Sequence, residues 1–350
     1  MTTHRYRRQE QFYPIGKEGQ KQLLKSKVLL CGCGALGSVI SESLTRAGVG
    51  SIHIIDRDEV QLDNLQRQSL YREADVLQRL PKAVAAKKHL QAINSEITIT
   101  ASVADLTAEN ILSYLDGVDL ILDGTDNFET RYLLNEAAIH KQVPWIFGGC
   151  LEGRGQVMPI LPGRRPCLNC VLPYSSAPPG GETCDSAGVL GPIVQVIAAF
   201  EVCEALKILT GNIQAVNRSL VVVDLWKNET RQIDLTSLRN QGGCSVCRDK
   251  KYQYFQTSSN GSLRGKGGQQ AKAMCGNNSV QLRPSERVTL DLTELARRLQ
   301  KVGSVSLNPY LLKFYVDDYE MTLFADGRTI VYGTTEIGHA RSLYAQYIGC

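Results

Sequence analysis

Four cysteines in two CxxC pairs are the clearest chemical signal in this sequence. Cys167 and Cys170 lie in PCLNC, and Cys244 and Cys247 lie in GCSVC. Two such pairs supply four thiolates, which is the ligand set of a tetrahedral structural zinc site. Four cysteines leave no open position for water, so we expect a structural metal. The alternatives are an iron–sulfur cluster, which also uses four cysteines, and four unrelated buried thiols.

A glycine-rich turn predicts a nucleotide site. The turn holds Gly32, Gly34 and Gly37, follows a buried strand predicted at 28–31 and opens an amphipathic helix, and Asp56 ends the next strand. Such a GxGxxG turn lets the backbone approach a phosphate at a helix N-terminus, and the acid can accept hydrogen bonds from ribose. The pattern does not distinguish NAD, FAD and ATP, and the alternative is a tight packing turn without a ligand.

The polar loop after Asp56 supplies candidate ligands for a nucleotide, of which Arg67 is the candidate for phosphate. Asp58, Asn64 and Arg67 lie in DRDEVQLDNLQRQ, which does not continue as a regular strand or helix, and Lys82 opens the next predicted helix. A guanidinium offers paired donors to phosphate oxygens. Each cation alone could be an ordinary surface charge. Together, after a phosphate-binding turn, they favour a triphosphate over a dinucleotide.

Two acidic residues follow the strand predicted at 119–122. Asp123 and Asp126 lie in DGTDN, at the carboxyl end of that strand, where open α/β sheets bind their ligands. Magnesium in triphosphate sites takes one or two carboxylates together with phosphate oxygens, so Asp126 is a candidate Mg2+ ligand. Alternatively, Asp126 or Asn127 caps the helix that we expect from about Glu129.

Two further residues have candidate roles outside the turn. Arg8 lies in the basic string RYRRQ, which is either a solvated arm or a segment that reaches another subunit. Cys184 follows a Pro/Gly/Ser-rich loop at 173–181 and precedes a long apolar helix predicted at 189–209. A thiolate near a helix N-terminus is stabilised and reactive, so Cys184 is our candidate nucleophile, with a structural role as the alternative.

Composition limits the class of protein. The 350 residues, 43% of them hydrophobic, are enough for one large α/β domain and a smaller one. A net charge of +4 does not indicate a nucleic-acid-binding surface. No segment reaches the about 18 consecutive apolar residues of a membrane span, and the N-terminus has no apolar signal region. We expect a cytoplasmic protein, in which 11 cysteines point to metal or sulfur chemistry.

The order of motifs predicts two domains. Alternating strands and helices indicate a Rossmann-like doubly wound α/β sheet with a structural zinc site over residues 1–248. Residues 249–270 are polar and rich in Gly, Ser, Gln and Lys, which indicates a linker. Residues 271–350 predict a small α+β domain, with a strand over 273–282, a helix, three further strands and a closing helix over 336–347.

In combination, these motifs resemble the ThiF/MoeB family of adenylyltransferases, the bacterial relatives of ubiquitin-activating enzymes. The resemblance runs over about residues 5–248. It includes RYRRQ, the glycine turn, DxDxVxxxNLQRQ, PK, DGTDN, TC followed by GVLGP, and both CxxC pairs. Residues 271–350 resemble the C-terminal extension of longer ThiF-type proteins, through the strings CGxNxVQ and ARSLYxxYIG.

This resemblance implies a site for ATP and Mg2+ in a homodimer. Asp56 would bind the ribose, Arg67 and Lys82 would contact phosphates, and Asp126 would hold Mg2+. Arg8 would reach the ATP of the other subunit.

The resemblance also implies the reaction and its partners. The C-terminal glycine carboxylate of a small ubiquitin-like sulfur-carrier protein, ThiS-like or MoaD-like and ending in Gly-Gly, attacks the α-phosphate of ATP. The products are an acyl-adenylate and pyrophosphate. The cysteine matching Cys184 can then form a covalent link to the carrier, and sulfur arrives from a donor such as a cysteine desulfurase. We expect thiamine biosynthesis first and molybdopterin biosynthesis second.

Three other interpretations remain open. The same adenylation could act on a peptide or a modified tRNA nucleoside, although the modest net charge argues against tRNA. An NAD-dependent oxidoreductase fits the glycine turn and Asp56, but it gives no role to Arg8, Arg67, Asp126 or the zinc site. A non-catalytic binding module is disfavoured because every residue type needed for adenylation is present.

Overall fold

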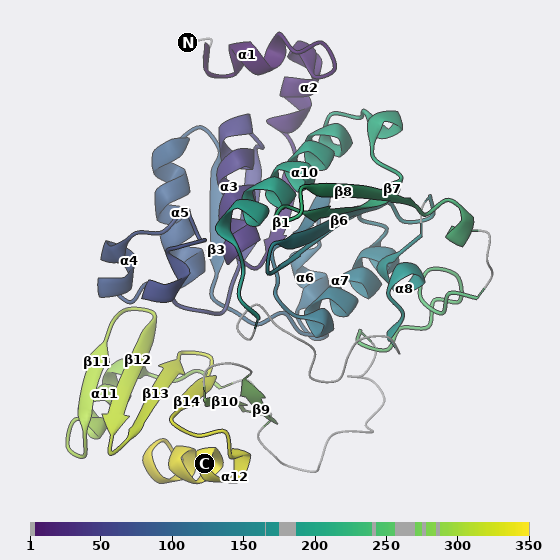
Figure 1. Cartoon of the computed structure of the whole chain (residues 1–350). Helices are drawn as coiled ribbons and strands as arrows, with labels where there is room; N and C mark the ends of the chain where they lie inside the picture. The colour runs from purple at the N-terminus through teal and green to yellow at the C-terminus, as the bar shows by residue number, and fades with distance from the viewer. Residues whose placement is uncertain are drawn as a thin grey trace. The chain divides into compact units, whose positions relative to one another are not determined.

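The chain divides into two compact units, Met1–Asn260 and Gly261–Cys350 (Figure 1). The computed structural model describes residues 4–164, 166–174, 187–239, 243–255, 270–274, 278–284 and 288–349. Each unit has its own hydrophobic core. Much of the linker predicted at 249–270 lies outside the described residues, so the domain boundaries stay a prediction.

The first unit is built on an eight-stranded sheet with the strand order β3-β2-β1-β4-β5-β6-β7-β8. The strands β1 to β5 run parallel, whereas β6, β7 and β8 are antiparallel additions at one edge. Their bounds are Lys27–Cys31 (β1), Ser51–Ile55 (β2), Thr98–Ser102 (β3), Leu120–Asp123 (β4), Trp145–Leu151 (β5), Arg154–Ile160 (β6), Ser219–Asp224 (β7) and Glu229–Asp234 (β8). The order reverses between β1 and β4, which is where doubly wound sheets bind ligands. The predicted fold class is confirmed.

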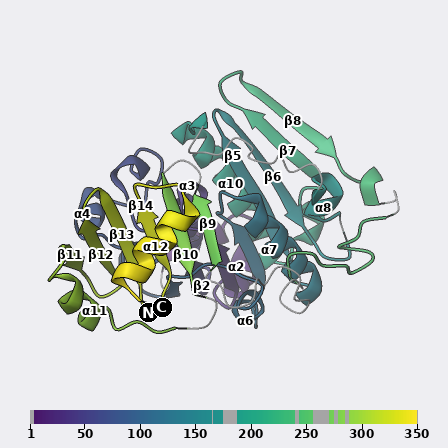
Figure 2. The same ribbon diagram turned by 90° about the horizontal axis from the view of Figure 1, so that it is seen from below.

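Helices cover both faces of this sheet. On one face, α3 and α10 lie side by side, and α2 and α5 share their core (Figures 1 and 2). On the other face α6 and α7 form the second core. The α-helices span Arg7–Glu10 (α1), Gly16–Leu23 (α2), Ala35–Ala47 (α3), Glu73–Leu77 (α4), Lys82–Ile93 (α5), Ile111–Tyr114 (α6), Phe128–Lys141 (α7), Leu168–Val171 (α8) and Gly191–Leu209 (α10). Short 3-10 helices span His4–Tyr6, Leu62–Asn64, Ile213–Ala215 and Ser237–Arg239. None of the described helices is long and apolar enough to cross a membrane.

The local sequence explains the two central elements of this unit. In β1, the residues from Val28 to Cys31 are all buried, because helices cover both faces of a central parallel strand. The helix α10 begins with Pro192 in its first turn, where the missing N–H costs nothing. It is apolar around most of its circumference, as expected for a helix that packs between a sheet and a second surface.

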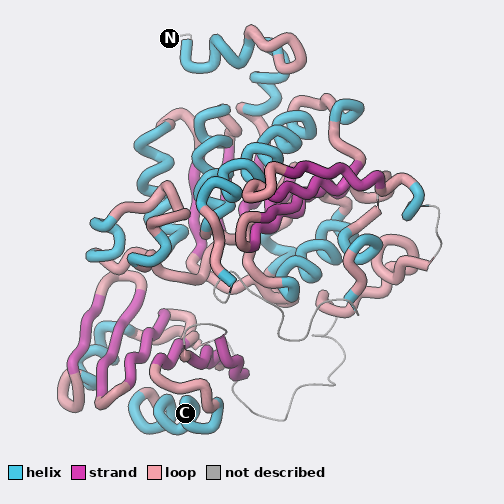
Figure 3. The backbone as a smooth tube through the Cα atoms, in the orientation of Figure 1, coloured by secondary structure: helices cyan, strands magenta, loops and turns pink. Residues whose placement is uncertain are grey.

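The second unit is a six-stranded antiparallel sheet that packs against two helices (Figure 3). Its strand order is β11-β12-β13-β14-β10-β9. The bounds are Gln270–Met274 (β9), Ser279–Arg283 (β10), Ser304–Leu307 (β11), Leu311–Val316 (β12), Tyr319–Phe324 (β13), Thr329–Tyr332 (β14), Leu292–Leu299 (α11) and Ile337–Tyr347 (α12). The single strand predicted over 273–282 is wrong, since β9 and β10 pair there in opposite directions. The chain reverses near Asn278, whose φ of 41° lies in the left-handed region that asparagine tolerates.

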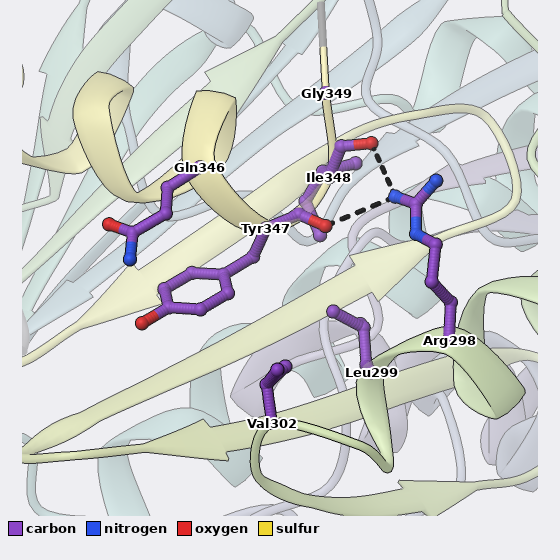
Figure 4. Close-up of a pocket in the computed structure, with 7 residues that line it drawn as sticks. All are labelled: Arg298, Leu299, Val302, Gln346, Tyr347, Ile348 and Gly349. Atoms are coloured by element: carbon purple, nitrogen blue, oxygen red, sulfur yellow. Dashed lines mark hydrogen bonds between the residues drawn. The ribbon is translucent and has the colours of Figure 1, made fainter.

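An arginine joins the two helices of the second unit. Arg298 of α11 donates from Nη2 to the carbonyl oxygens of Tyr347 and Ile348, at 3.1 and 2.7 Å, at the end of α12 (Figure 4). A cation at this position satisfies carbonyls that have no partner inside the helix. The same residues border a hollow of about 510 Å³. We assign Arg298 to the stability of this helix pair.

The helix α10 buries an acid in the core of the first unit. Glu201 is fully buried, and neither of its carboxyl oxygens has a hydrogen-bond partner among the described residues. Its carboxyl group lies against Gly148 of β5, where any Cβ would overlap with it. Burial raises the pKa of Glu201 well above its usual value, Asp123 raises it further, and Arg131 opposes both only in part. The surroundings of Glu201 therefore favour its protonated form in the folded protein.

This proton makes stability depend on pH. The unfolded chain releases the proton above its ordinary pKa while the folded chain keeps it, so folding stability falls as pH rises from about 5 towards the raised pKa, by up to about 1.4 kcal/mol per pH unit. Glu201→Gln keeps the shape and cannot ionise. We expect the variant to gain stability relative to the parent as pH rises, measured as urea midpoints between about pH 5.5 and 8. Parallel curves for the two proteins would contradict a buried neutral acid, and Glu42→Gln on the surface of α3 serves as control.

Candidate functional site

The three glycines of the turn between β1 and α3 have different surroundings. A Cβ on Gly32 would lie 2.5 Å from the carbonyl oxygen of Gly124, and a Cβ on Gly37 would lie 2.1 Å from that of Gly32. Gly32 also has a φ of 84°, which favours glycine. Around Gly34 the nearest atom would be Nε2 of Gln68, at 3.7 Å. The first and third glycines therefore serve packing, and the middle one faces open space, where the prediction places a phosphate.

Asp56 holds this turn against the end of β2. Its Oδ2 accepts from the backbone N–H of Cys33 at 2.6 Å, and its Oδ1 accepts from the N–H of Asp58 at 2.8 Å. Burial raises the pKa of Asp56, and the ammonium of Lys82 opposes that rise. Asp56, which is predicted to bind the ribose, therefore lies at the turn and also shapes it, because its carboxylate orders the backbone of the turn.

Lys82 and Asp58 form an ion pair beside the turn. Lys82 is 8% exposed, and its Nζ lies 3.3 Å from Oδ2 of Asp58. Burial by itself would lower the pKa of Lys82, but the carboxylates of Asp58, Asp56 and Asp126 outweigh it and raise the pKa. Lys82 is thus held as a cation at the carboxyl edge of the sheet. Its ammonium group interacts with three of the acidic residues discussed for the site, Asp56, Asp58 and Asp126.

The loop with the NLQRQ string folds over the glycine turn. Tyr71 donates its hydroxyl to the carbonyl oxygen of Cys33 at 2.6 Å. Asn64 is buried and accepts from the N–H of Gln61 at 3.2 Å, while Arg67 donates from Nη1 to the carbonyl oxygen of Asp63 at 3.0 Å. Both predicted residues therefore help to hold the loop, and their contacts with the nucleotide stay a prediction.

Two residues of this region were missed by sequence reasoning. Gln68 is 3% exposed, and its Oε1 has no hydrogen-bond partner among the described residues. Arg57 follows Asp56 directly and pairs with Asp105, at 3.0 Å between Nη1 and Oδ1. The position of Arg57 beside the predicted ribose acid was a signal in the sequence. Burial of Gln68 becomes visible only when the loop closes on the turn.

After β4, the structure shows which of Asp126 and Asn127 caps the next helix, a question that the sequence left open. Asn127 caps α7, since its side chain accepts from the N–H of Thr130 at 2.9 Å. Asp126 is exposed, and the amide of Asn127 donates to its Oδ1 at 3.2 Å. The helix does not use the Asp126 carboxylate as its cap. This leaves Asp126 available to a cation at the edge where Lys82 lies.

Asp123 fixes the loop that carries Asp126. It is fully buried and accepts from Nε of Arg131 at 3.0 Å and from the hydroxyl of Thr125 at 2.6 Å. Arg131 also donates to the carbonyl oxygen of Gly148 on β5 at 3.0 Å. Burial raises the pKa of Asp123, and Arg131 works against that rise. This predicted residue orders the loop from inside the protein.

Among the described residues Arg8 is not connected to the turn, and nothing is shown for Cys184. Arg8 is exposed on α1 and donates from Nη1 to Oε1 of Gln11 at 3.3 Å. No hydrogen bond or ion pair among the described residues links it to the site of its own chain. Cys184, the candidate nucleophile, lies outside the described residues.

The two CxxC pairs come together as predicted. The sulfur atoms of Cys167 and Cys244 are 3.6 Å apart, those of Cys167 and Cys170 are 3.8 Å apart, and those of Cys170 and Cys247 are 3.5 Å apart. All four lie within 4.8 Å of one another. A tetrahedral zinc ion with bonds of about 2.3 Å needs sulfur atoms about 3.8 Å apart, so the cluster fits zinc.

A buried carboxylate next to this cluster was also missed. Glu136 of α7 is fully buried and accepts from the backbone N–H groups of Gln253, Tyr254 and Phe255 at 2.7, 2.8 and 2.7 Å. The hydroxyl of Tyr174 donates to the same carboxylate. Hydrogen bonds to a charged acceptor are the strong ones. Glu136 therefore fastens the chain after both CxxC pairs to α7.

Comparison with known proteins identifies the family of this chain. The model of the ThiF family matches residues 6–247. The sulfur carrier protein ThiS adenylyltransferase of Bacillus subtilis is 43% identical over 349 residues, covering 99% of this chain and 100% of the relative. The sulfur carrier protein adenylyltransferase of Thermus thermophilus is 37% identical over 254 residues, covering 71% of this chain and 92% of the relative.

A more distant comparison supports the fold alone. The crystal structure of Escherichia coli MccB with ATP superposes with a TM-score of 0.56 at 23% identity, covering 70% of this chain and 75% of that chain. The family match spans the glycine turn, the polar loop and both CxxC pairs, and the Bacillus relative is similar along its whole length. The chain therefore belongs to the ThiF family, as the motifs predicted.

Proposed function

We propose that this chain adenylylates the C-terminal glycine carboxylate of a small ubiquitin-like sulfur-carrier protein, with ATP as the second substrate. The observation that carries the proposal is the ion pair of Lys82 and Asp58, which is joined to the glycine turn through Asp56, because the Asp56 carboxylate accepts from the N–H groups of both Asp58 and Cys33. The full-length relative that is named a ThiS adenylyltransferase favours a ThiS-like carrier, and hence thiamine biosynthesis, with a MoaD-like carrier as the second choice.

In this proposal, different residues bind the phosphates, the ribose and the magnesium ion. The glycine turn and the first N–H groups of α3 receive phosphate, and Asp56 accepts from the ribose hydroxyls. Lys82 and Arg67 neutralise phosphate charge, and Asp126 holds Mg2+ through its exposed carboxylate. Magnesium, when bound there, neutralises charge on the leaving pyrophosphate.

The reaction needs positioning more than proton transfer. A carboxylate oxygen of the carrier's terminal glycine forms a bond to the α-phosphorus, and the bond from that phosphorus to the bridging oxygen of pyrophosphate breaks. The carboxylate is already ionised at neutral pH, so no general base is required. Lys82 and Arg67 stabilise the charge that develops on phosphate oxygens, which is the main contribution open to an enzyme here.

The sulfur step follows adenylation. In this proposal Cys184 attacks the carbonyl carbon of the acyl-adenylate as a thiolate, AMP leaves, and a thioester with the carrier remains. The terminal sulfur of a persulfide on a separate donor, such as a cysteine desulfurase, then attacks the thioester carbonyl and releases the Cys184 thiolate. That thiolate attacks the donor's sulfur in the resulting acyl disulfide, which frees the carrier thiocarboxylate and leaves a disulfide between Cys184 and the donor. The glycine-rich composition around Cys184 and its place ahead of α10 support this role.

The proposed enzyme is a homodimer in which Arg8 acts on the partner's ATP. Arg8 is exposed and contributes no hydrogen bond to its own site among the described residues. The outer side of α10 leaves Phe200 36% exposed, although this helix is apolar almost all round, which fits a surface that a second copy covers.

Carrier-dependent exchange of labelled pyrophosphate into ATP tests the activity. We expect exchange with a ThiS-like carrier ending in Gly-Gly and none with a carrier that lacks the final glycine. Asp126→Ala is expected to lower the exchange rate by about a hundredfold or more, because the leaving group loses its metal. Cys184→Ser is the matched control, which keeps exchange and loses the covalent adduct. Exchange that is absent with both ThiS-like and MoaD-like carriers would reject the substrate proposed here.

The metal assignment predicts one zinc per chain. Removal of zinc by a chelator, or Cys167→Ser, is expected to lower the unfolding free energy by more than about 3 kcal/mol, because the four thiolates then lose the ion that joins them. Metal content is measured by elemental analysis and stability by urea unfolding. Cys203→Ser changes an exposed cysteine outside the cluster and should alter neither. A protein isolated with iron, or with full stability after chelation, would contradict a structural zinc.

A mixed dimer tests the role of Arg8. Arg8→Ala and Asp126→Ala are each expected to be inactive alone. When co-expressed, half of the dimers carry both chains, and one of the two sites in each such dimer is intact, so exchange should return to about one quarter of the parent rate. Recovery requires that Arg8 act across the interface. A mass of one chain in sedimentation equilibrium, or dimers without recovery, would exclude this arrangement.

A further inference from the structure

A guanidinium lies directly beyond the predicted ribose acid. Arg57 follows Asp56 at the carboxyl end of β2, and Asp105 follows β3, the neighbouring parallel strand. Arg57 donates from Nη1 to Oδ1 of Asp105 at 3.0 Å, and its side chain is 27% exposed. It therefore stands on the β2–β3 side of the site, away from the glycine turn that receives phosphate.

Two carboxylates hold different edges of this guanidinium. Asp105 binds Nη1, and Oδ1 of Asp58 lies 3.6 Å from Nε. A phosphate that binds an arginine bidentately uses either Nε with Nη2 or Nη1 with Nη2. Each of these pairs includes a nitrogen that already faces a carboxylate. A phosphate would have to displace one of these carboxylates, whereas a ring that stacks on the flat face of the guanidinium leaves both contacts in place.

The surrounding charges keep Arg57 in place and ionised. Burial alone would lower its pKa, but Asp58, Asp105 and Asp126 outweigh that effect and raise the pKa. Asp58 also pairs with Lys82 through its other oxygen, at 3.3 Å. The carboxylate of Asp58 thus orients both Lys82, on the side where phosphate is proposed to bind, and Arg57, at the end of β2.

We propose that the guanidinium plane of Arg57 is the platform on which the adenine base of ATP stacks, with Asp105 as its positioning residue. The inference rests on the proposed function to the extent that Asp56 binds the ribose, because the base attached to that ribose then lies next to Arg57. Guanidinium planes stack on aromatic rings, and a charged plane gains from the ring electrons as well. The proposal names a base-recognition residue within the same nucleotide site.

The test separates stacking from phosphate binding. Affinities of the full-length protein for the α,β-methylene analogue of ATP and for inorganic tripolyphosphate are measured by calorimetry, without carrier. Arg57→Ala is expected to weaken binding of the analogue by about tenfold or more, since base stacking on a side chain is worth that much, and to leave tripolyphosphate unchanged. Arg57→Tyr, which restores a plane without the charge, should recover most of the affinity, and Arg57→Lys should not.

Asp105→Asn should give an intermediate loss, because the plane stays but its anchor weakens. Arg154→Ala, which breaks an ion pair with Asp224 on β7, is the control and should change neither affinity. An equal loss for the analogue and tripolyphosphate would make Arg57 a phosphate ligand, and no loss would make it a structural ion pair; either result overturns the proposal. A parent protein that binds the analogue but shows no carrier-dependent exchange would reject the proposed function and leave the stacking role standing.

Discussion

The close approach of two backbones at Gly32 and Gly124 is the constraint on which the site depends. These residues follow the neighbouring strands β1 and β4, and there is no room for a Cβ between them. The contact brings the glycine turn next to the loop that leads to Asp126. Asp56 then draws the turn towards β2 through the N–H of Cys33. Three strand ends are joined in this way. The residues proposed to touch the nucleotide within one chain lie at these ends, on the loop that closes over them or, for Lys82, at the start of α5.

Features that depend on residue type and local spacing could be predicted from the sequence. The strand before the turn is apolar because both its faces are covered, and the glycines, Asp56 and the CxxC pairs occur at spacings that their roles require. The sequence could not decide between Asp126 and Asn127 as the helix cap, because both types cap helices equally well. Only the backbone geometry shows that Asn127 takes this position.

Other features depended on contacts between distant segments. Glu136 gives no local signal, since its partners Gln253, Tyr254 and Phe255 are more than a hundred residues away. The same holds for Glu201, whose neutral form follows from burial that the helix pattern alone does not report. For both acids the deciding quantity was the environment created by the fold. The hairpin of β9 and β10 was missed for a different reason, because Gly276, Asn277 and Asn278 are residue types that favour a turn and this local signal was overlooked.

The division of the three glycines has a consequence for how this family can vary. Gly32 and Gly37 are required by the fold, because a side chain at either position would overlap with backbone atoms and destabilise the protein. Gly34 has space around it, so a side chain there alters only what the turn accommodates. Within these six residues, two glycines are thus fixed by packing, whereas the third can change without disturbing the fold. A lineage could abandon nucleotide binding at this position and still inherit an intact scaffold.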